Sequence, residues 1–138
     1  MTLYLDCEFS RFHGKLISLA LASTTGEHWY RVLPLPDDMH PWVKENVVPV
    51  LGAEPDKPVV FRASLWEYLR THRSETIIAD WPEDFGHLMQ WLCEPNGMGL
   101  ALELDMRLIR SGELKPDVPH NALSDAIALM HWHVGQGG

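Results

Sequence analysis

The sequence predicts an α/β domain in which helices flank a mixed five-stranded sheet. The first 35 residues contain three segments with the composition and alternation of strands, separated by short polar stretches. The rest of the chain alternates helices of apolar periodicity with short apolar strands. Because 138 residues is the length of one ordinary domain, we expect one hydrophobic core and a single domain spanning residues 1–138.

The three N-terminal strands are expected at residues 3–10 (LYLDCEFS), 15–23 (KLISLALAS) and 28–35 (HWYRVLPL). In the first, Leu3, Leu5 and Cys7 alternate with polar neighbours, which is typical of a strand with one buried face. Residues 24–27 (TTGE) have the composition of a hairpin turn between the second and third strands. Three consecutive antiparallel strands are therefore predicted.

The elements that follow are read from helical periodicity, proline positions and short apolar runs. We expect a short helix at 41–51 interrupted by Pro49, an amphipathic helix at 59–72, a strand at 75–79, a helix at 80–92, a fifth strand at 99–105 and, after a polar loop at 111–119, a last helix at 121–134. The buried stripes are expected to include Met89 in the fourth of these elements and Val134 in the last.

The composition is that of a soluble globular protein, with 46% hydrophobic and 22% charged residues. No apolar run is long enough to span a bilayer, and the N-terminus lacks the pattern of a secretory signal, so we expect a cytoplasmic protein. Cys7 and Cys93 fit no zinc-binding spacing and are expected to be reduced thiols. The net charge of −8 disfavours nucleic-acid binding over a broad surface, although two divalent cations in an acidic site would halve that charge.

Asp6 and Glu8 are the first unusual feature, because both carboxylates lie on one face of the first strand. Residues two apart on a strand are separated by about 6.6 Å along it, so the two charges repel unless a cation lies between them. This pair predicts a cation site on that face.

Two further acids begin the helix at 80–92. Asp80 precedes Trp81 and Pro82 with Glu83 three residues on, which is the pattern of a helix cap and capping box. Asp84 lies next to the apolar stripe, where an unpaired carboxylate is costly to bury. We therefore favour Asp84 as the third carboxylate of the site, with Asp80 as the alternative.

The last helix repeats this anomaly within PHNALSDA (119–126). Asp125 flanks the core stripe of its helix, and His120 stands at the helix entrance, where it can turn toward the site that Asp125 lines.

A set of ligands that contains only oxygen and no sulfur favours Mg²⁺ or Mn²⁺ over zinc. Two such ions can hold a phosphodiester, one activating the attacking water and the other stabilising the leaving oxygen. An imidazole titrates near neutral pH, so His120 can serve as the general base.

These residues resemble the three motifs of the DEDDh 3′-to-5′ exonucleases, a group that includes ribonuclease T and compact bacterial exoribonucleases. Asp6 and Glu8 are similar to the D-x-E motif, Asp84 to the second motif, and His120 with Asp125 to the H-x-x-x-x-D motif. The resemblance implies a ribonuclease H-like fold, two Mg²⁺ or Mn²⁺ ions bound by Asp6, Glu8, Asp84 and Asp125, and His120 as general base. It also implies a homodimer that removes mononucleotides from the 3′ end of single-stranded or overhanging RNA, or DNA.

The chain departs from that family pattern at two points. Phe9, Ser10, Arg11 and Phe12 follow the first motif where many relatives have Thr-Gly, and Asp80 stands where the second motif often has Asn. Phe9 and Phe12 are candidates for stacking on a base, with burial in the core as the alternative, and Arg11 is a candidate phosphate contact.

Other signals are weaker. His131 and His133 are two residues apart on a helix and point to different sides, so we do not expect them to bind one ion. Two other functions remain open besides the exonuclease. One is a non-catalytic nucleic-acid-binding or accessory subunit of the same fold, and the other is a phosphodiesterase specific for dinucleotides. Substrate-length dependence separates the latter from an exonuclease.

Overall fold

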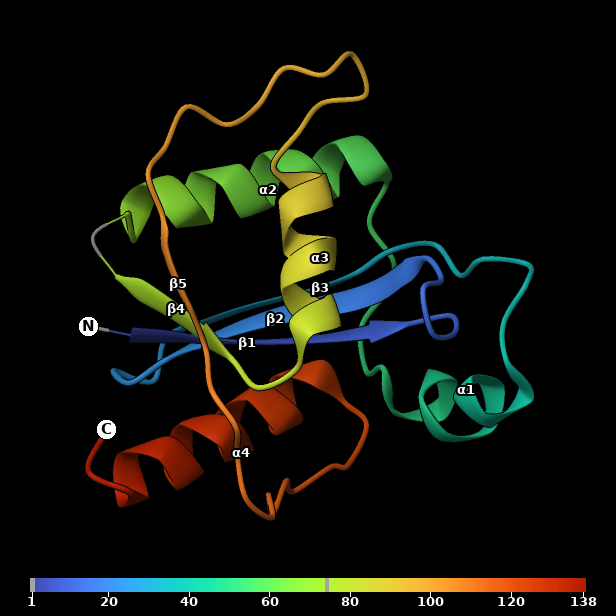
Figure 1. Cartoon of the computed structure of the whole chain (residues 1–138). Coiled ribbons are helices and arrows are strands. Elements are labelled where there is room, and N and C mark those ends of the chain that lie inside the picture. Colours follow the sequence, from blue (N-terminus) through green and yellow to red (C-terminus); the bar gives the residue numbers. More distant parts are fainter. Residues whose placement is uncertain (1, 74) are drawn as a thin grey trace.

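A computed structural model describes residues 2–73 and 75–138 of the chain. It has the predicted α/β architecture, with a five-stranded mixed sheet in the order β3-β2-β1-β4-β5. Figure 1 shows helices α2 and α3 on one side of this sheet and α4 on the other. Within the described ranges, no helix is both long and apolar enough to cross a membrane.

The three N-terminal strands form the predicted antiparallel meander: β1 (Thr2–Phe9), β2 (Leu16–Ser23) and β3 (His28–Val32). Alternation along β1 divides its side chains between two cores, as expected for a strand covered on both faces. Leu3, Leu5 and Cys7 pack in the cluster that contains residues of α2 and α3, whereas Tyr4 packs with Leu129 of α4. Asp6 and Glu8 have the same parity as Tyr4, so they belong to the α4 face.

The other two strands, β4 (Thr76–Ala79) and β5 (Asp105–Leu108), extend the sheet in parallel with β1. The prediction of a fifth strand at 99–105 is wrong in its position. Leu100, Leu102 and Leu104 do pack against the core, which explains their apolar alternation, but residues 100–104 belong to none of the strands in the described part of the chain. Pairing begins at Asp105 because the short β4 offers its partners only from Thr76 onward.

The helices are α1 (Pro41–Asn46), α2 (Pro58–Thr71), α3 (Pro82–Trp91) and α4 (Ala122–Gly135), with a 3₁₀ turn η1 (Val48–Val50) after α1. The single helix predicted at 41–51 is thus divided near Pro49, whose ring cannot continue an α-helix. Met89 and Val134 were expected on buried faces, yet both are 51% exposed. Cys7 and Cys93 are free thiols, as predicted.

Candidate metal centre

The acidic residues meet where β1 extends past its parallel neighbour. β1 pairs with β4 only over Thr2–Tyr4, so Asp6 and Glu8 lie beyond the last paired residue. The carboxyl ends of parallel strands in an α/β sheet leave a crevice of this kind, and ligands commonly bind there. Asp84 reaches this place from the first turn of α3, and Asp125 reaches it from the first turn of α4.

Five carboxylates form two groups that share one residue. Asp6, Glu8 and Asp125 each offer a carboxylate oxygen such that the three atoms lie within 4.8 Å of one another. Asp6, Asp80 and Asp84 satisfy the same condition. The structure therefore brings together all four acids expected in the site and adds Asp80, with Asp6 common to both groups.

Burial and mutual repulsion raise the pKa values of Asp6, Glu8 and Asp84. Burial is the main cause of a pKa of about 9 for Glu8, and the nearby Asp125 raises it further. Burial followed by the charge of Asp80 raises the pKa of Asp84 to about 8, although a hydrogen bond from the Cys7 backbone acts in the opposite direction. Asp6 has its pKa raised well above the ordinary value, first by burial and then by Asp84. Such a cluster needs protons or cations to neutralise it.

Buried oxygens without hydrogen-bond partners are a second reason to expect divalent cations at these residues. Asp6 Oδ2 and Asp84 Oδ2 are buried and accept no hydrogen bond from any described residue. An unpaired buried acceptor is unfavourable, and a cation between the carboxylates would satisfy both oxygens. All the ligand atoms are carboxylate oxygens, which suit Mg²⁺ or Mn²⁺.

Asp80 does not have the capping role that the sequence suggested. The N-cap of α3 is Trp81, which makes no side-chain capping hydrogen bond, and Pro82 occupies the tolerated first position. Asp80 Oδ2 instead accepts a hydrogen bond of 2.6 Å from Ser111 Oγ. Glu83 does not complete a capping box either, because its Oε2 accepts from the His13 backbone N–H at 2.7 Å. The local pattern therefore placed the start of the helix slightly too early and gave the acid the wrong role.

His120 lies directly before α4, beside the first acidic group. Its backbone has φ 70°, the left-handed conformation that is uncommon for a residue with a side chain. Asn121 follows as the N-cap of α4, and its side-chain oxygen accepts from Ser124 N at 3.0 Å. Burial is the largest influence on Asp125 and raises its pKa, while a hydrogen bond with Glu8 and then the proximity of His120 partly offset this. The predicted general base is therefore next to the predicted ligand Asp125.

The ring of His120 meets an aromatic residue that the sequence did not single out. Trp42 of α1 lies edge-on to it, with ring centroids 4.7 Å apart. Trp42 is 46% exposed and reaches this place because the His40 N–H bonds to Ser10 O, just after β1, at 2.9 Å. The sequence signal for Trp42 is weak: it is one tryptophan in a short helix, and only the contact with His120 distinguishes it.

A pocket of about 280 Å³ adjoins the acids, and Glu8 contributes to both. Its lining comes from the end of β1 and from the start of α1: Glu8, Phe9, Arg11, Phe12, His40, Trp42 and Val43. Of the two candidate stacking residues, Phe12 is 66% exposed, whereas Phe9 is partly buried and stacks on His87 with centroids 4.7 Å apart. Arg11 is paired with Asp38, which reduces its availability to a phosphate.

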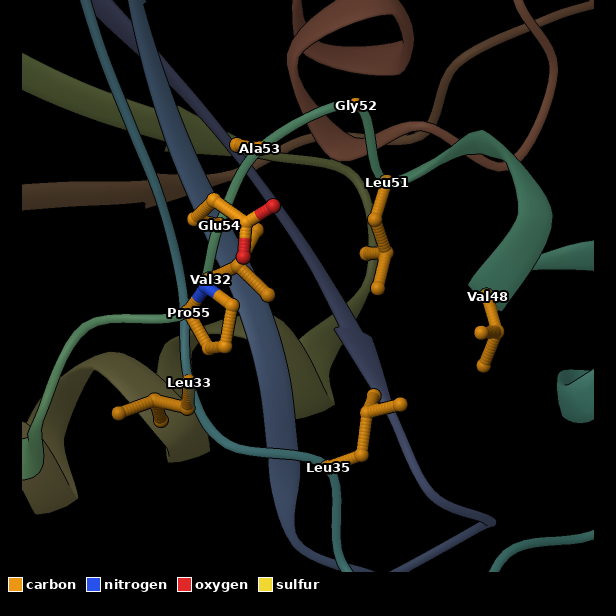
Figure 2. Close-up of a pocket in the computed structure, with 9 residues that line it drawn as sticks. All are labelled: Val32, Leu33, Leu35, Val48, Leu51, Gly52, Ala53, Glu54 and Pro55. Carbon is orange, nitrogen blue, oxygen red and sulfur yellow. The ribbon is translucent and has the colours of Figure 1, made fainter.

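A larger pocket elsewhere in the described chain is mainly apolar. The pocket in Figure 2, of about 490 Å³, lies between the end of β3 and residues 48–55 and is lined mainly by aliphatic side chains such as Val32, Leu35 and Leu51. Glu54 is the one ionisable residue in its lining. His133 is held by a 2.8 Å hydrogen bond with the Tyr4 hydroxyl, and it forms no metal group with His131 within the described residues.

No protein-family model matches this chain, and no curated protein matches its sequence. The geometry and chemistry of the acids therefore carry the functional conclusion.

Proposed function

We propose that this protein is a metal-dependent 3′-to-5′ exonuclease with a ribonuclease H-like fold. The observation that carries the proposal is the pair of acidic groups joined by Asp6, with the imidazole of His120 beside one of them. Three separate segments of the chain supply these groups, and burial together with neighbouring acids raises the pKa values of Asp6, Glu8 and Asp84. A site that concentrates negative charge at such a cost is well explained by cations that a reaction requires.

The residues have distinct roles in this reaction. Bound Mg²⁺ or Mn²⁺ would stabilise the charge that builds on the attacking and leaving oxygens of a phosphodiester. Asp6, Glu8 and Asp125 would hold one ion, and Asp6 with Asp84 would hold the other. His120 needs no ligand role, and its position at the edge of the acids suits the removal of a proton from the attacking water. The 3′-to-5′ direction follows from the likeness of these residues to the DEDDh motifs.

The pocket beside Glu8 supports a single-stranded substrate. Phe12 and Trp42 present exposed aromatic rings in its lining, and stacking on such rings holds a base without regard to its sequence. The 3′-terminal nucleotide would place its base there and its phosphate at the acids. RNA is the favoured substrate, and a homodimer would add surface for holding it.

A labelled substrate tests the proposal directly. RNA and DNA ladders carrying a 5′ label should shorten from the 3′ end when Mg²⁺ or Mn²⁺ is present, and EDTA should stop the reaction. Asp84→Asn is the matched control, since it keeps the side-chain shape and removes a ligand. Internal cleavage, or binding without any hydrolysis at saturating metal, would contradict the exonuclease; the second result would favour an accessory binding subunit.

A dinucleotide-specific phosphodiesterase is the second candidate, and two observations favour it. The pocket of about 280 Å³ is small, and the nearby cation Arg11 is already paired with Asp38. An enzyme of this kind should cleave a dinucleotide much faster than a ten-nucleotide RNA. Comparable rates on both lengths would rule it out.

A further inference from the structure

Asp80 lies immediately after β4, and Ser111 lies shortly after β5, the parallel strand beside it. The carboxyl ends of these neighbouring strands bring the two residues together, so that Ser111 Oγ donates to Asp80 Oδ2 at 2.6 Å. This hydrogen bond fixes the carboxylate at the edge of the acidic site. Asp80 is thus oriented by the loop that leads to His120, and not by the helix it precedes.

The group formed by Asp6, Asp80 and Asp84 contains an oxygen that nothing in the described protein satisfies. Asp84 is only 2% exposed, and its Oδ2 has no hydrogen-bond partner there. Carboxylate oxygens of Asp6 and Asp80 lie within 4.8 Å of an Asp84 oxygen. Three carboxylates this close together, one of which has a buried oxygen without a partner, offer the oxygen ligands that a small divalent cation prefers.

We propose that Asp80 is an additional metal ligand, which completes a second cation site made wholly of protein carboxylates and lets the second cation bind before any nucleic acid arrives. The inference rests on the proposed nuclease function, in which two cations serve one reaction. Without Asp80 the second site would have only Asp84 and the shared Asp6, and its remaining positions would await the substrate phosphate. With Asp80, three anionic ligands bind that ion in the free protein.

Ser111 is a positioning residue in this arrangement. A ligand whose second oxygen is already hydrogen-bonded loses less freedom when it binds the metal, and partners of this kind commonly change metal affinity by about 10- to 100-fold. Ser111→Ala should weaken the second ion by about that factor and leave the first ion unchanged.

Binding of Mn²⁺ in the absence of nucleic acid tests the proposal. The electron paramagnetic resonance signal of free Mn²⁺ gives the number of ions bound per chain, and two ions that share Asp6 should also show spin coupling. We expect two ions in the wild type and one in Asp80→Asn. Asparagine keeps an oxygen for Ser111, so the fold should be preserved, which a melting curve checks. Glu8→Gln is the matched control, because Glu8 lies outside the second group and its loss should weaken the first ion instead.

The outcomes separate this inference from the function on which it rests. Two ions in the wild type and one in Asp80→Asn support it. One ion in the wild type, or two equally tight ions in both proteins, overturns the role of Asp80, while hydrolysis of the labelled ladders would leave the nuclease intact. No bound ion in any form would overturn the inference and remove the basis of the nuclease as well.

Discussion

The ring of Trp42 lies edge-on against the ring of His120, with their centroids 4.7 Å apart. The two residues are far apart in sequence, and each is anchored by its own contact. The helix that carries Trp42 is joined to the end of β1 through His40 and Ser10, and His120 is joined to α4 through the Asn121 cap. The tryptophan therefore links the proposed general base to the strand that carries Asp6 and Glu8.

Removal of this contact should affect catalysis more than metal binding. Without the tryptophan ring, His120 would sample more rotamers, so we expect Trp42→Ala to lower kcat while Mn²⁺ affinity stays close to that of the wild type. Trp42→Phe should restore much of the rate, because a phenyl ring can still contact the imidazole. Steady-state kinetics with both variants checks this. A change in KM alone would show that Trp42 contacts only the substrate.

Loss of an acid should have opposite effects on function and on stability. Asp6→Asn and Asp125→Asn should abolish hydrolysis and weaken Mn²⁺ binding, because each removes a ligand. The same changes remove repulsion between buried carboxylates, so the metal-free variants should melt at the same temperature as the wild type or higher. Calorimetry measures both quantities. Undiminished Mn²⁺ binding in both variants would disprove the ligand assignment.

Replacement of the proposed base should leave the metals in place. His120→Ala should lower turnover by about 10²- to 10⁴-fold, the range typical of general-base removal. A general base acts by accepting a proton, so the pH dependence of turnover should differ between the wild type and the variant. Both proteins must be compared with the same metal at saturation, since bound metal also changes the titration of water. Equal rates across the pH range would exclude His120 from the reaction.

The metal-free protein should lose stability as the pH rises. The pKa of Asp84 is raised from 3.8 to about 8 and that of Glu8 from 4.5 to about 9, so the folded protein binds protons more tightly than the unfolded chain. The stability that these protons contribute is complete below the unfolded pKa values and is lost as the pH rises through the folded ones. Melting temperatures in EDTA should therefore fall between about pH 4 and pH 9.

Metal and mutation provide the controls for this pH dependence. Saturating Mn²⁺ should flatten the upper part of the curve, because the cation replaces the protons between the carboxylates. Glu8→Gln should reduce the slope in EDTA, since a neutral amide needs no proton. A curve in EDTA that is level across the whole range would show that these carboxylates ionise freely in the folded protein.

Much of the fold follows from local patterns. The alternation of β1 was sufficient to place Asp6 and Glu8 on one face, and proline positions marked the beginnings of helices. The strand predicted at 99–105 failed because apolar alternation reports packing against a core and not pairing with a neighbour. Leu100 and Leu102 do pack there, but the fifth strand itself begins only at Asp105, opposite Thr76 at the start of β4.

The site shows the same limit. Asp84 was identified from its place beside an apolar stripe, which is a local property. Asp80 was assigned to a cap because its own surroundings, Trp81 to Glu83, satisfy that pattern. Its actual partner Ser111 lies 31 residues away, and no local pattern contains that information. The sequence does not single out Trp42 for the same reason, because its ring contacts His120 only once α1 and α4 have both packed against the sheet.

Helix α4 also determines when the acidic site can form during synthesis of the chain. This helix covers a face of the sheet through Ala122 and Ala126, which pack on Ala20 and Ala22. It also carries Asp125 in its first turn, and His120 lies just before it in the chain. A ribosome makes these residues after every strand, and chains fold from the N-terminus as they emerge. A nascent chain that lacks α4 would therefore carry four of the five acids but neither Asp125 nor a finished core, so the first acidic group, Asp6, Glu8 and Asp125, would be incomplete until α4 has been made.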